Sequence, residues 1–152
     1  DVYKSQVRPD VAVFGKKDYQ QLTIIKEMVS QFGMPIRIVP AELQRNQETG
    51  LALSSRNRYL SAQELEDATL LYKTVKGVKD ALEAETADPD VLEERAMKML
   101  DGHGWIPDYV AVVRRSDLLA PTKDDLVKRT PLVVLAAAKI GTTRLIDNVE
   151  VF

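Results

Sequence analysis

The chain has 152 residues, of which 45% are hydrophobic and 29% are charged, and its formal net charge is −2 at pH 7. These proportions are ordinary for a globular protein, and the length suits one domain or two small ones that share a core. The low net charge excludes bulk attraction to nucleic acid or acidic membranes, so any anion site must be local.

Cysteine and histidine are too scarce for several kinds of site. With no cysteine, the chain cannot form disulfides or thiolate metal sites, which fits a reducing cytoplasm. The single histidine, His103, excludes a multi-histidine metal site within this chain, and we interpret "GHGW" as a surface turn. No apolar run approaches the roughly 20 residues of a membrane span, and nothing resembles a signal peptide. We therefore expect neither a membrane nor a nucleic acid as partner.

Residues 1–43 read as a strand, a helix and a second strand. "PDVAVF" (9–14) predicts a short strand, apolar enough to be covered on both faces. Helical spacing follows it, and "MPIRIVP" (34–40) is again β-prone, with Gly33 as the stop between helix and strand. The apolar positions of this helix are Tyr19, Leu22, Ile25, Met28, Val29 and Phe32. The pattern predicts a βαβ unit.

Residues 44–152 predict an α+β region. The polar stretch "QRNQETG" (44–50) is typical of a hinge or linker, and Ser61 with Glu64 forms a capping box that opens a helix. "DPD" (88–90) opens a second helix that ends near Leu100. The first helix carries Leu65, Ala68, Tyr72, Val75, Val78 and Leu82 on one face. Residues 108–113, 131–141 and 142–151 predict three strands, the last two as a hairpin, so two helices should cover a small antiparallel sheet.

The turn "FGKKDYQQL" (14–22) is unusually rich in polar groups. Loops between a parallel strand and a helix are where α/β sheets bind ligands, because backbone N–H groups and the helix dipole converge there. Gly15 permits close approach of the main chain, Lys17 suits a phosphate, Asp18 suits a ribose diol, and Gln21 suits a carboxylate or hydroxyl. The alternative is structural: Asp18 is the N-cap, Gln21 closes a capping box, and the lysines are solvated.

A second polar cluster lies in "GLALSSRN" (50–57). Ser54 and Ser55 supply hydroxyl donors and Arg56 a forked positive charge, which together could hold an anion. The alternative is a serine-rich turn whose arginine pairs with a surface carboxylate. Both clusters follow short apolar runs about one βαβ unit apart, so folding could bring them to one cleft.

Together, these two motifs resemble the pantoate–β-alanine ligase (pantothenate synthetase) family. Its pattern is F-G-x-K-D-aromatic-Q-Q, then G-L-A-aliphatic-S-S-R-N about thirty residues later, and both are met here. The tail, with "VAVV" and "VLAAAKIGTTRLIDN", also resembles the family. The resemblance implies an α/β fold: the last βαβ part of a Rossmann-like nucleotidyl-transferase domain (1–43), then a smaller α+β lid domain (44–152).

The resemblance also implies an activity and site residues. The family joins pantoate to β-alanine with ATP and Mg²⁺ through pantoyl adenylate, releasing AMP and pyrophosphate, usually as a cytoplasmic homodimer. Gly15 and Asp18 match positions that hold the ATP ribose, Lys17 one that meets its phosphates, and Gln21 one that binds pantoate. Ser54, Ser55 and Arg56 match the loop that grips the β- and γ-phosphates.

The sequence departs from the family pattern in two places, which limits the assignment of the family's site residues to this chain. The "RNQETG" loop is one residue longer than expected, which leaves the adenine contacts near Gln44 and Arg45 open. The family's amino-terminal half, with its H-x-G-H signature, a second pantoate glutamine and the acidic group near magnesium, has no counterpart here. We therefore expect a carboxy-terminal half that holds no metal ligands and is inactive alone.

Two alternative functions stay open. One is another nucleotidyl-transferase of the same fold, such as a cytidylyltransferase, and the other is a non-catalytic domain. Gln21 separates the first from the ligase, because a pantoate site needs it and a nucleotide-only site does not. Stabilisation by added nucleotide would separate the second.

Overall fold

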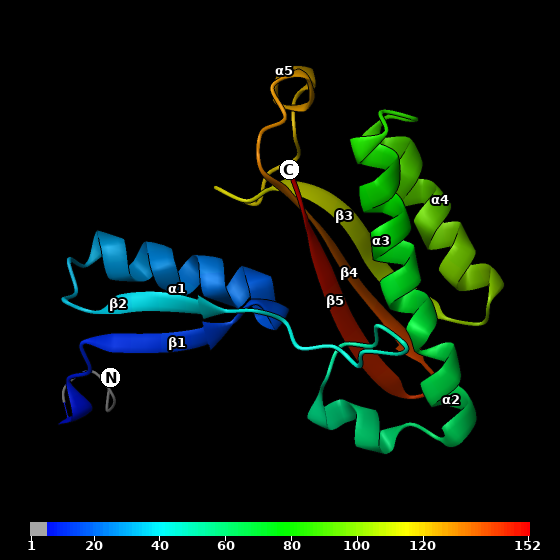
Figure 1. The fold of residues 1–152 in the computed structure, drawn as a ribbon, viewed down its shortest axis with the longest axis horizontal. Coiled ribbons are helices and arrows are strands. Elements are labelled where there is room, and N and C mark those ends of the chain that lie inside the picture. The colour runs from blue at the N-terminus through cyan, green and yellow to red at the C-terminus, as the bar shows by residue number, and fades with distance from the viewer. Residues whose placement is uncertain (1–5) are drawn as a thin grey trace. The chain divides into compact units, whose positions relative to one another are not determined.

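The computed structural model describes residues 6–152 of the chain. Its contacts divide the chain into two compact units, Asp1–Leu43 (unit 1) and Gln44–Phe152 (unit 2). Unit 1 contains a parallel strand pair and unit 2 a three-stranded antiparallel sheet with helices (Figure 1). The predicted α/β fold class is confirmed.

Unit 1 is the predicted βαβ arrangement. Strand β1 (Val11–Gly15) pairs in parallel with β2 (Arg37–Ala41), and the 3₁₀ helix η2 (Lys16–Asp18) and helix α1 (Tyr19–Gln31) connect them. The helix stops where the sequence predicts, because Gly33 adopts a φ of +56° and Met34 N donates to Val29 O at 3.0 Å.

The strands of unit 1 are less buried than their composition predicts. No residue of β1 or β2 is fully buried, and the Val13 side chain is 64% exposed. Tyr19 and Leu22 of α1 are the buried hydrophobic residues among residues 6–43. The expectation that β1 is covered on both faces is therefore wrong for this chain, since unit 1 supplies a single long helix as cover.

Unit 2 is built on a sheet with the strand order β3-β4-β5. Its strands are β3 (Ile106–Arg114), β4 (Leu132–Ile140) and β5 (Thr143–Val151). Strands β4 and β5 form the predicted hairpin, turning at Gly141 with a φ of +55°. Helices α3 (Thr69–Glu83) and α4 (Pro89–Gly102) pack against the sheet side by side (Figure 1).

The core of unit 2 lies between these helices and the sheet. Strand β4 is central, and its residues 132–138 are all buried. Fully or almost fully buried side chains join it from the surrounding elements: Leu71, Val75, Leu100, Trp105, Val112 and Val151. This core fixes one face of α3 and α4, as the helical spacing predicts.

The helix expected from residue 61 onward is broken in two. The Ser61–Glu64 capping box is present and opens α2 (Ala62–Asp67), but α3 begins only at Thr69. Ala68 between them is completely buried, and its carbonyl accepts from Leu71 N at 3.3 Å. Two further short elements were not predicted: the 3₁₀ helix η3 (Ser55–Tyr59) and helix α5 (Lys123–Val127).

Candidate functional site

Gly15 ends β1 just before η2 and α1. Its backbone is extended, with φ −71° and ψ 138°, so its conformation does not require glycine. A Cβ atom added there would meet nothing within 4 Å among the described residues. Neither strain nor packing within the described chain requires glycine at this position, and its role in ligand approach stays a prediction.

The two lysines of η2 differ from the structural alternative, in which both are solvated. Lys16 Nζ pairs with Glu42 Oε1 at 2.6 Å, and its side chain is only 14% exposed. Lys17 is partly buried. Lys16 therefore joins η2 to the segment after β2.

Asp18 and Gln21 do not form the capping box that the structural alternative requires. Asp18 occupies the N-cap position of α1, but no side-chain hydrogen bond caps the helix there. The side chains of Asp18 and Gln21 are both exposed. Asp18 is therefore the N-cap by position, as the structural alternative has it, but the capping box is absent. The polar groups of both residues lie beside the helix N-terminus, where a ligand can reach them.

Ser54, Ser55 and Arg56 lie at the start of η3 in unit 2. Ser54 Oγ accepts from Arg56 N at 3.2 Å as the N-cap, and a hydroxyl that accepts still has its own proton to donate. Arg56 Nη1 donates to the carbonyl of Arg144 at 3.2 Å, so its partner is a main-chain oxygen and not the carboxylate of the structural alternative. Ser55 and Arg56 are exposed, which suits donors to an anion.

The structure gathers the predicted site residues into two local clusters. Gly15, Lys17, Asp18 and Gln21 lie at and after the end of β1 within unit 1, and Ser54 to Arg56 begin η3 within unit 2. That both clusters line one cleft stays a prediction. His103 is an exposed residue at the end of α4, where its Nδ1 lies 2.7 Å from Met99 O, as expected of a surface turn.

Arg45 lies where the resemblance leaves adenine contacts of the backbone open, and the sequence assigns no role to its side chain. Its guanidinium makes a bidentate ion pair with Asp147, at 2.8 Å for both contacts. The "QRNQETG" stretch is consequently not an open linker. It is a closed loop in which Asn46 N donates to Leu51 O and Gly50 N to Asn46 O, both at 2.9 Å. An arginine in a polar loop and an aspartate in "LIDN" are individually unremarkable, so no sequence signal links them.

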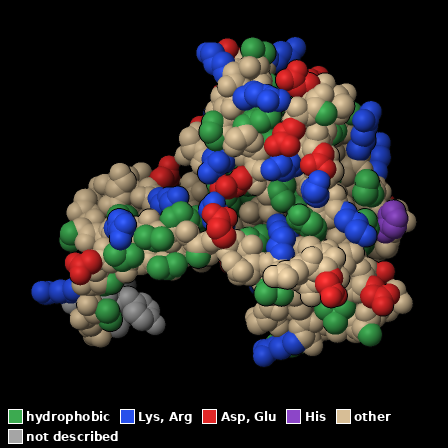
Figure 2. Space-filling view, viewed as in Figure 1, with side chains coloured by type: hydrophobic (Ala, Val, Ile, Leu, Met, Phe, Trp, Pro, Cys, Tyr) green, Lys and Arg blue, Asp and Glu red, His purple; other side chains and the backbone are tan. Residues whose placement is uncertain are grey.

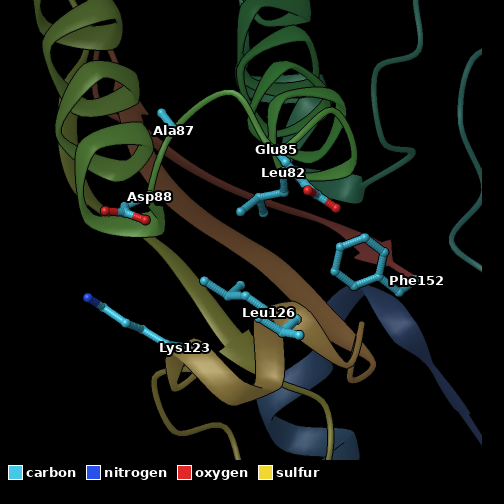
Figure 3. Close-up of a pocket in the computed structure, with 8 residues that line it drawn as sticks. Leu82, Glu85, Ala87, Asp88, Lys123, Leu126 and Phe152 are labelled. Carbon is cyan, nitrogen blue, oxygen red and sulfur yellow. The ribbon is translucent and has the colours of Figure 1, made fainter.

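A pocket of about 540 Å³ elsewhere in unit 2 contains none of the predicted residues. Leu82, Leu126 and Phe152 give it an apolar surface, with Lys123, Glu85 and Asp88 around them (Figure 3). On the face shown in Figure 2, acidic and basic side chains are interspersed, without a broad patch of one sign. This face therefore offers no broad charged surface for an anion, in keeping with the low net charge.

Two classes of feature are missing from the described chain. Among residues 6–152, no group of three or more His, Cys, Asp or Glu side chains could hold a metal ion. No helix in the same range has both the length and the apolar composition for crossing a membrane.

Comparison with known proteins agrees with these motifs. The family model described as pantoate-beta-alanine ligase matches residues 3–150. The crystal structure of pantothenate synthetase from Thermus thermophilus superimposes with a TM-score of 0.81 at 31% identity, over 96% of this chain and 51% of that one. The pantoate-beta-alanine ligase of Francisella tularensis, complexed with beta-gamma ATP and beta-alanine, gives a TM-score of 0.62 at 27% identity, over 92% of this chain and 43% of that one.

The chain has the α/β architecture of these ligases and belongs to the pantoate–β-alanine ligase family. The resemblance stated from the two motifs is confirmed. The chain spans about half the length of the solved structures that it matches.

Proposed function

We propose that this chain contributes to an enzyme that condenses pantoate with β-alanine, with ATP converted to AMP and pyrophosphate. The observation that carries the proposal is the pair of polar clusters on family motifs, in which Gln21, Ser55 and Arg56 are exposed and Asp18 makes no capping bond. A relative whose structure contains beta-gamma ATP and beta-alanine supports the same substrates.

The first half-reaction would form pantoyl adenylate. A pantoate carboxylate oxygen attacks the α-phosphorus of ATP, and the bond from this phosphorus to the bridging oxygen breaks, so that pyrophosphate leaves with the electron pair. Such a reaction needs the carboxylate held in line and the negative charge on both phosphate groups neutralised. In the proposal, Gln21 orients pantoate, Gly15 and Asp18 hold the ribose, and Lys17 meets the α-phosphate.

The second cluster would hold the leaving group. Ser54 and Ser55 donate to the β- and γ-phosphates, and Arg56 supplies the forked charge.

In the second half-reaction the β-alanine amine attacks the pantoyl carbonyl, AMP departs, and the amine loses its proton to solvent. ATP would be used together with Mg²⁺, to which the proposal assigns no residue of this chain. For the complete protein the corresponding expectation is a cytoplasmic homodimer, and its mass in solution tests the dimer.

Arg56 provides the experiment that tests this assignment. In the complete enzyme, Arg56→Ala should slow pantoate-dependent exchange of pyrophosphate into ATP by about 10²-fold or more. The reason is that the guanidinium no longer stabilises the negative charge on the departing pyrophosphate. The same variant should pass preformed pantoyl adenylate to β-alanine at close to the normal rate, since pyrophosphate has already left.

Two further variants sharpen the test. Lys17→Ala should slow both half-reactions, because its phosphate stays on the adenylate throughout. Arg56→Lys should rescue exchange in part, because it keeps the charge and loses the fork. Equal slowing of both half-reactions by Arg56→Ala would defeat the assignment and give Arg56 a structural role.

A further inference from the structure

We propose that Arg45 is a positioning residue for the first half-reaction: it holds the segment of residues 45–57 on β5 so that Ser54, Ser55 and Arg56 are presented to the phosphates of ATP. The inference rests on the proposed function of these three residues. It gives a function to the loop of residues 45–50, which is one residue longer than the family pattern.

The contacts of Arg45 use both terminal nitrogens of its guanidinium. Nη1 donates to Asp147 Oδ2 at 2.8 Å and to Gly50 O at 3.1 Å, and Nη2 donates to Asp147 Oδ1 and Asn148 O, each at 2.8 Å. The guanidinium carbon lies 4.1 Å from the centre of the Tyr72 ring. The side chains of Arg45 and Asp147 are only 19% and 3% exposed, so the pair is largely shielded from water.

A series of hydrogen bonds connects Arg45 to the segment that contains Ser54 and Ser55. Arg45 forms a β-bridge with Ala52, and Leu53 N donates to Gln44 O at 2.9 Å, which ties the two ends of the loop together. Asn57 Nδ2 then donates to Ala52 O at 3.1 Å, so the peptide before Leu53 is bonded to η3, which Ser54 caps.

The loop is also fitted to Tyr72. Gly50 has a φ of +75°, and a Cβ atom there would lie 2.2 Å from Cδ1 of the Tyr72 ring, which also stacks on Arg45. At the other end of the segment, Arg56 Nη1 bonds to Arg144 O, on the same strand as Asp147. The segment is therefore held to β5 at both ends, and Arg45 makes the larger set of contacts.

The apolar core of unit 2 does not include Arg45. The buried cluster between α3, α4 and the sheet consists of apolar side chains. A variant that loosens Arg45 should shift the serines and Arg56 while the core stays folded. Small displacements of groups that hold a reacting substrate can cost up to about 10²-fold in rate.

The test uses Arg45→Lys in the complete enzyme, because lysine keeps the charge beside Asp147 and loses the fork and the stacking face. We expect the KM for ATP in pyrophosphate exchange to rise about tenfold or more. Transfer of preformed pantoyl adenylate to β-alanine should stay within about twofold of normal, because the displaced groups no longer contact a substrate. Tyr72→Leu removes the aromatic ring that stacks on Arg45 and leaves the Arg45–Asp147 ion pair intact. We expect it to raise the KM for ATP by less than Arg45→Lys does.

Arg114→Lys is the matched control. Arg114 also makes a bidentate pair, with Asp117 at 3.1 and 2.9 Å, and its side chain is 20% exposed. It lies in β3, which β4 separates from β5 in the sheet. It should leave both half-reactions unchanged. Arg45 is merely structural if Arg45→Lys and Arg114→Lys change the KM for ATP alike, or if Arg45→Lys slows both half-reactions equally.

Arg56→Ala separates the two proposals. Positioning by Arg45 is overturned, and the phosphate role retained, if Arg56→Ala slows exchange while Arg45→Lys and Tyr72→Leu leave the KM for ATP normal. Exchange that survives Arg56→Ala overturns the phosphate role and the positioning role with it.

Discussion

Gln21 is exposed at the start of α1, one residue beyond Gln20, which is also exposed. Since no side chain caps this helix, the amide of Gln21 has no capping duty to explain its presence. In the complete enzyme, Gln21→Ala should lower kcat/KM for pantoate far more than for ATP. The loss of one specific hydrogen bond to a substrate corresponds to roughly 1–3 kcal/mol.

Gln20→Ala is the matched control for this measurement, because it removes the same side chain from the neighbouring position of the helix. Gln21→Glu should be more harmful than Gln21→Ala, since a carboxylate there repels the carboxylate of pantoate. Normal pantoate kinetics in Gln21→Glu would rule out a pantoate contact, and would favour a nucleotide-only site.

Residue types and spacing were sufficient to predict that the polar residues group at the end of β1 and at the start of η3, because such groups depend on neighbours along the chain. Their role as a binding site stays a prediction. The Arg45–Asp147 pair could not be predicted in the same way, since its partners are 102 residues apart and meet only through the packing of unit 2. The exposure of β1 was likewise missed, because an apolar strand pattern does not say which elements cover it.

At the scale of the elements, helix starts and the hairpin followed from local chemistry. The Ser61–Glu64 box and the turn at Gly141 lie where capping and turn rules place them. The break at Ala68 has no such signal: alanine is a good helix former, and here it is buried completely where one helix ends and the next begins. Packing against the core overrides propensity at this point.

The contact between α4 and β3 predicts a dependence of stability on pH. Glu93 of α4 accepts from Val112 N of β3 at 2.7 Å, and partial burial raises the pKa of its carboxyl above the ordinary 4.5. The folded state therefore holds this proton more tightly than the unfolded chain does. The free energy of unfolding from this group falls as pH rises from about 4.5 through the raised pKa.

Glu93→Gln keeps an oxygen to accept from Val112 and removes the charge, so it should abolish this fall. Urea midpoints measured across this pH interval check it. Glu94→Gln is the control with the opposite sign, because the hydrogen bond from Lys98 lowers the pKa of Glu94 and its stabilising effect is lost as pH falls. A pH profile unchanged by Glu93→Gln would show that the Glu93 carboxyl does not titrate differently in the folded state.

At the scale of the whole molecule, the apolar core is distributed unevenly between the units. Residues 44–152 contain the buried cluster, and residues 132–138 of β4 are all buried, whereas Tyr19 and Leu22 are the buried hydrophobic residues of 6–43. Isolated chains of about 40 residues with so small a core rarely fold, and single short helices are marginal in water.

We therefore expect residues 44–152, produced alone, to unfold cooperatively, and residues 1–43 alone to show little helix by circular dichroism. Both peptides can be compared with the parent chain in thermal scans at equal concentration. A cooperative transition in residues 1–43, or a gradual one in residues 44–152, would contradict this division of stability.

The shielding of Arg45 and Asp147 has a consequence for ionic strength. Dissolved ions screen exposed charges strongly and buried pairs much less. Pairs on helix surfaces such as Lys76–Asp80, about half exposed, should weaken in concentrated salt before the Arg45 pair does. Salt should also screen the attraction between the exposed Arg56 and the phosphates of incoming ATP. If salt reduces the affinity of the complete enzyme for ATP, we expect the cause to be the screened attraction between Arg56 and the phosphates. The loop that carries Ser54 and Ser55 should keep its position, because the Arg45–Asp147 pair is shielded from the added ions.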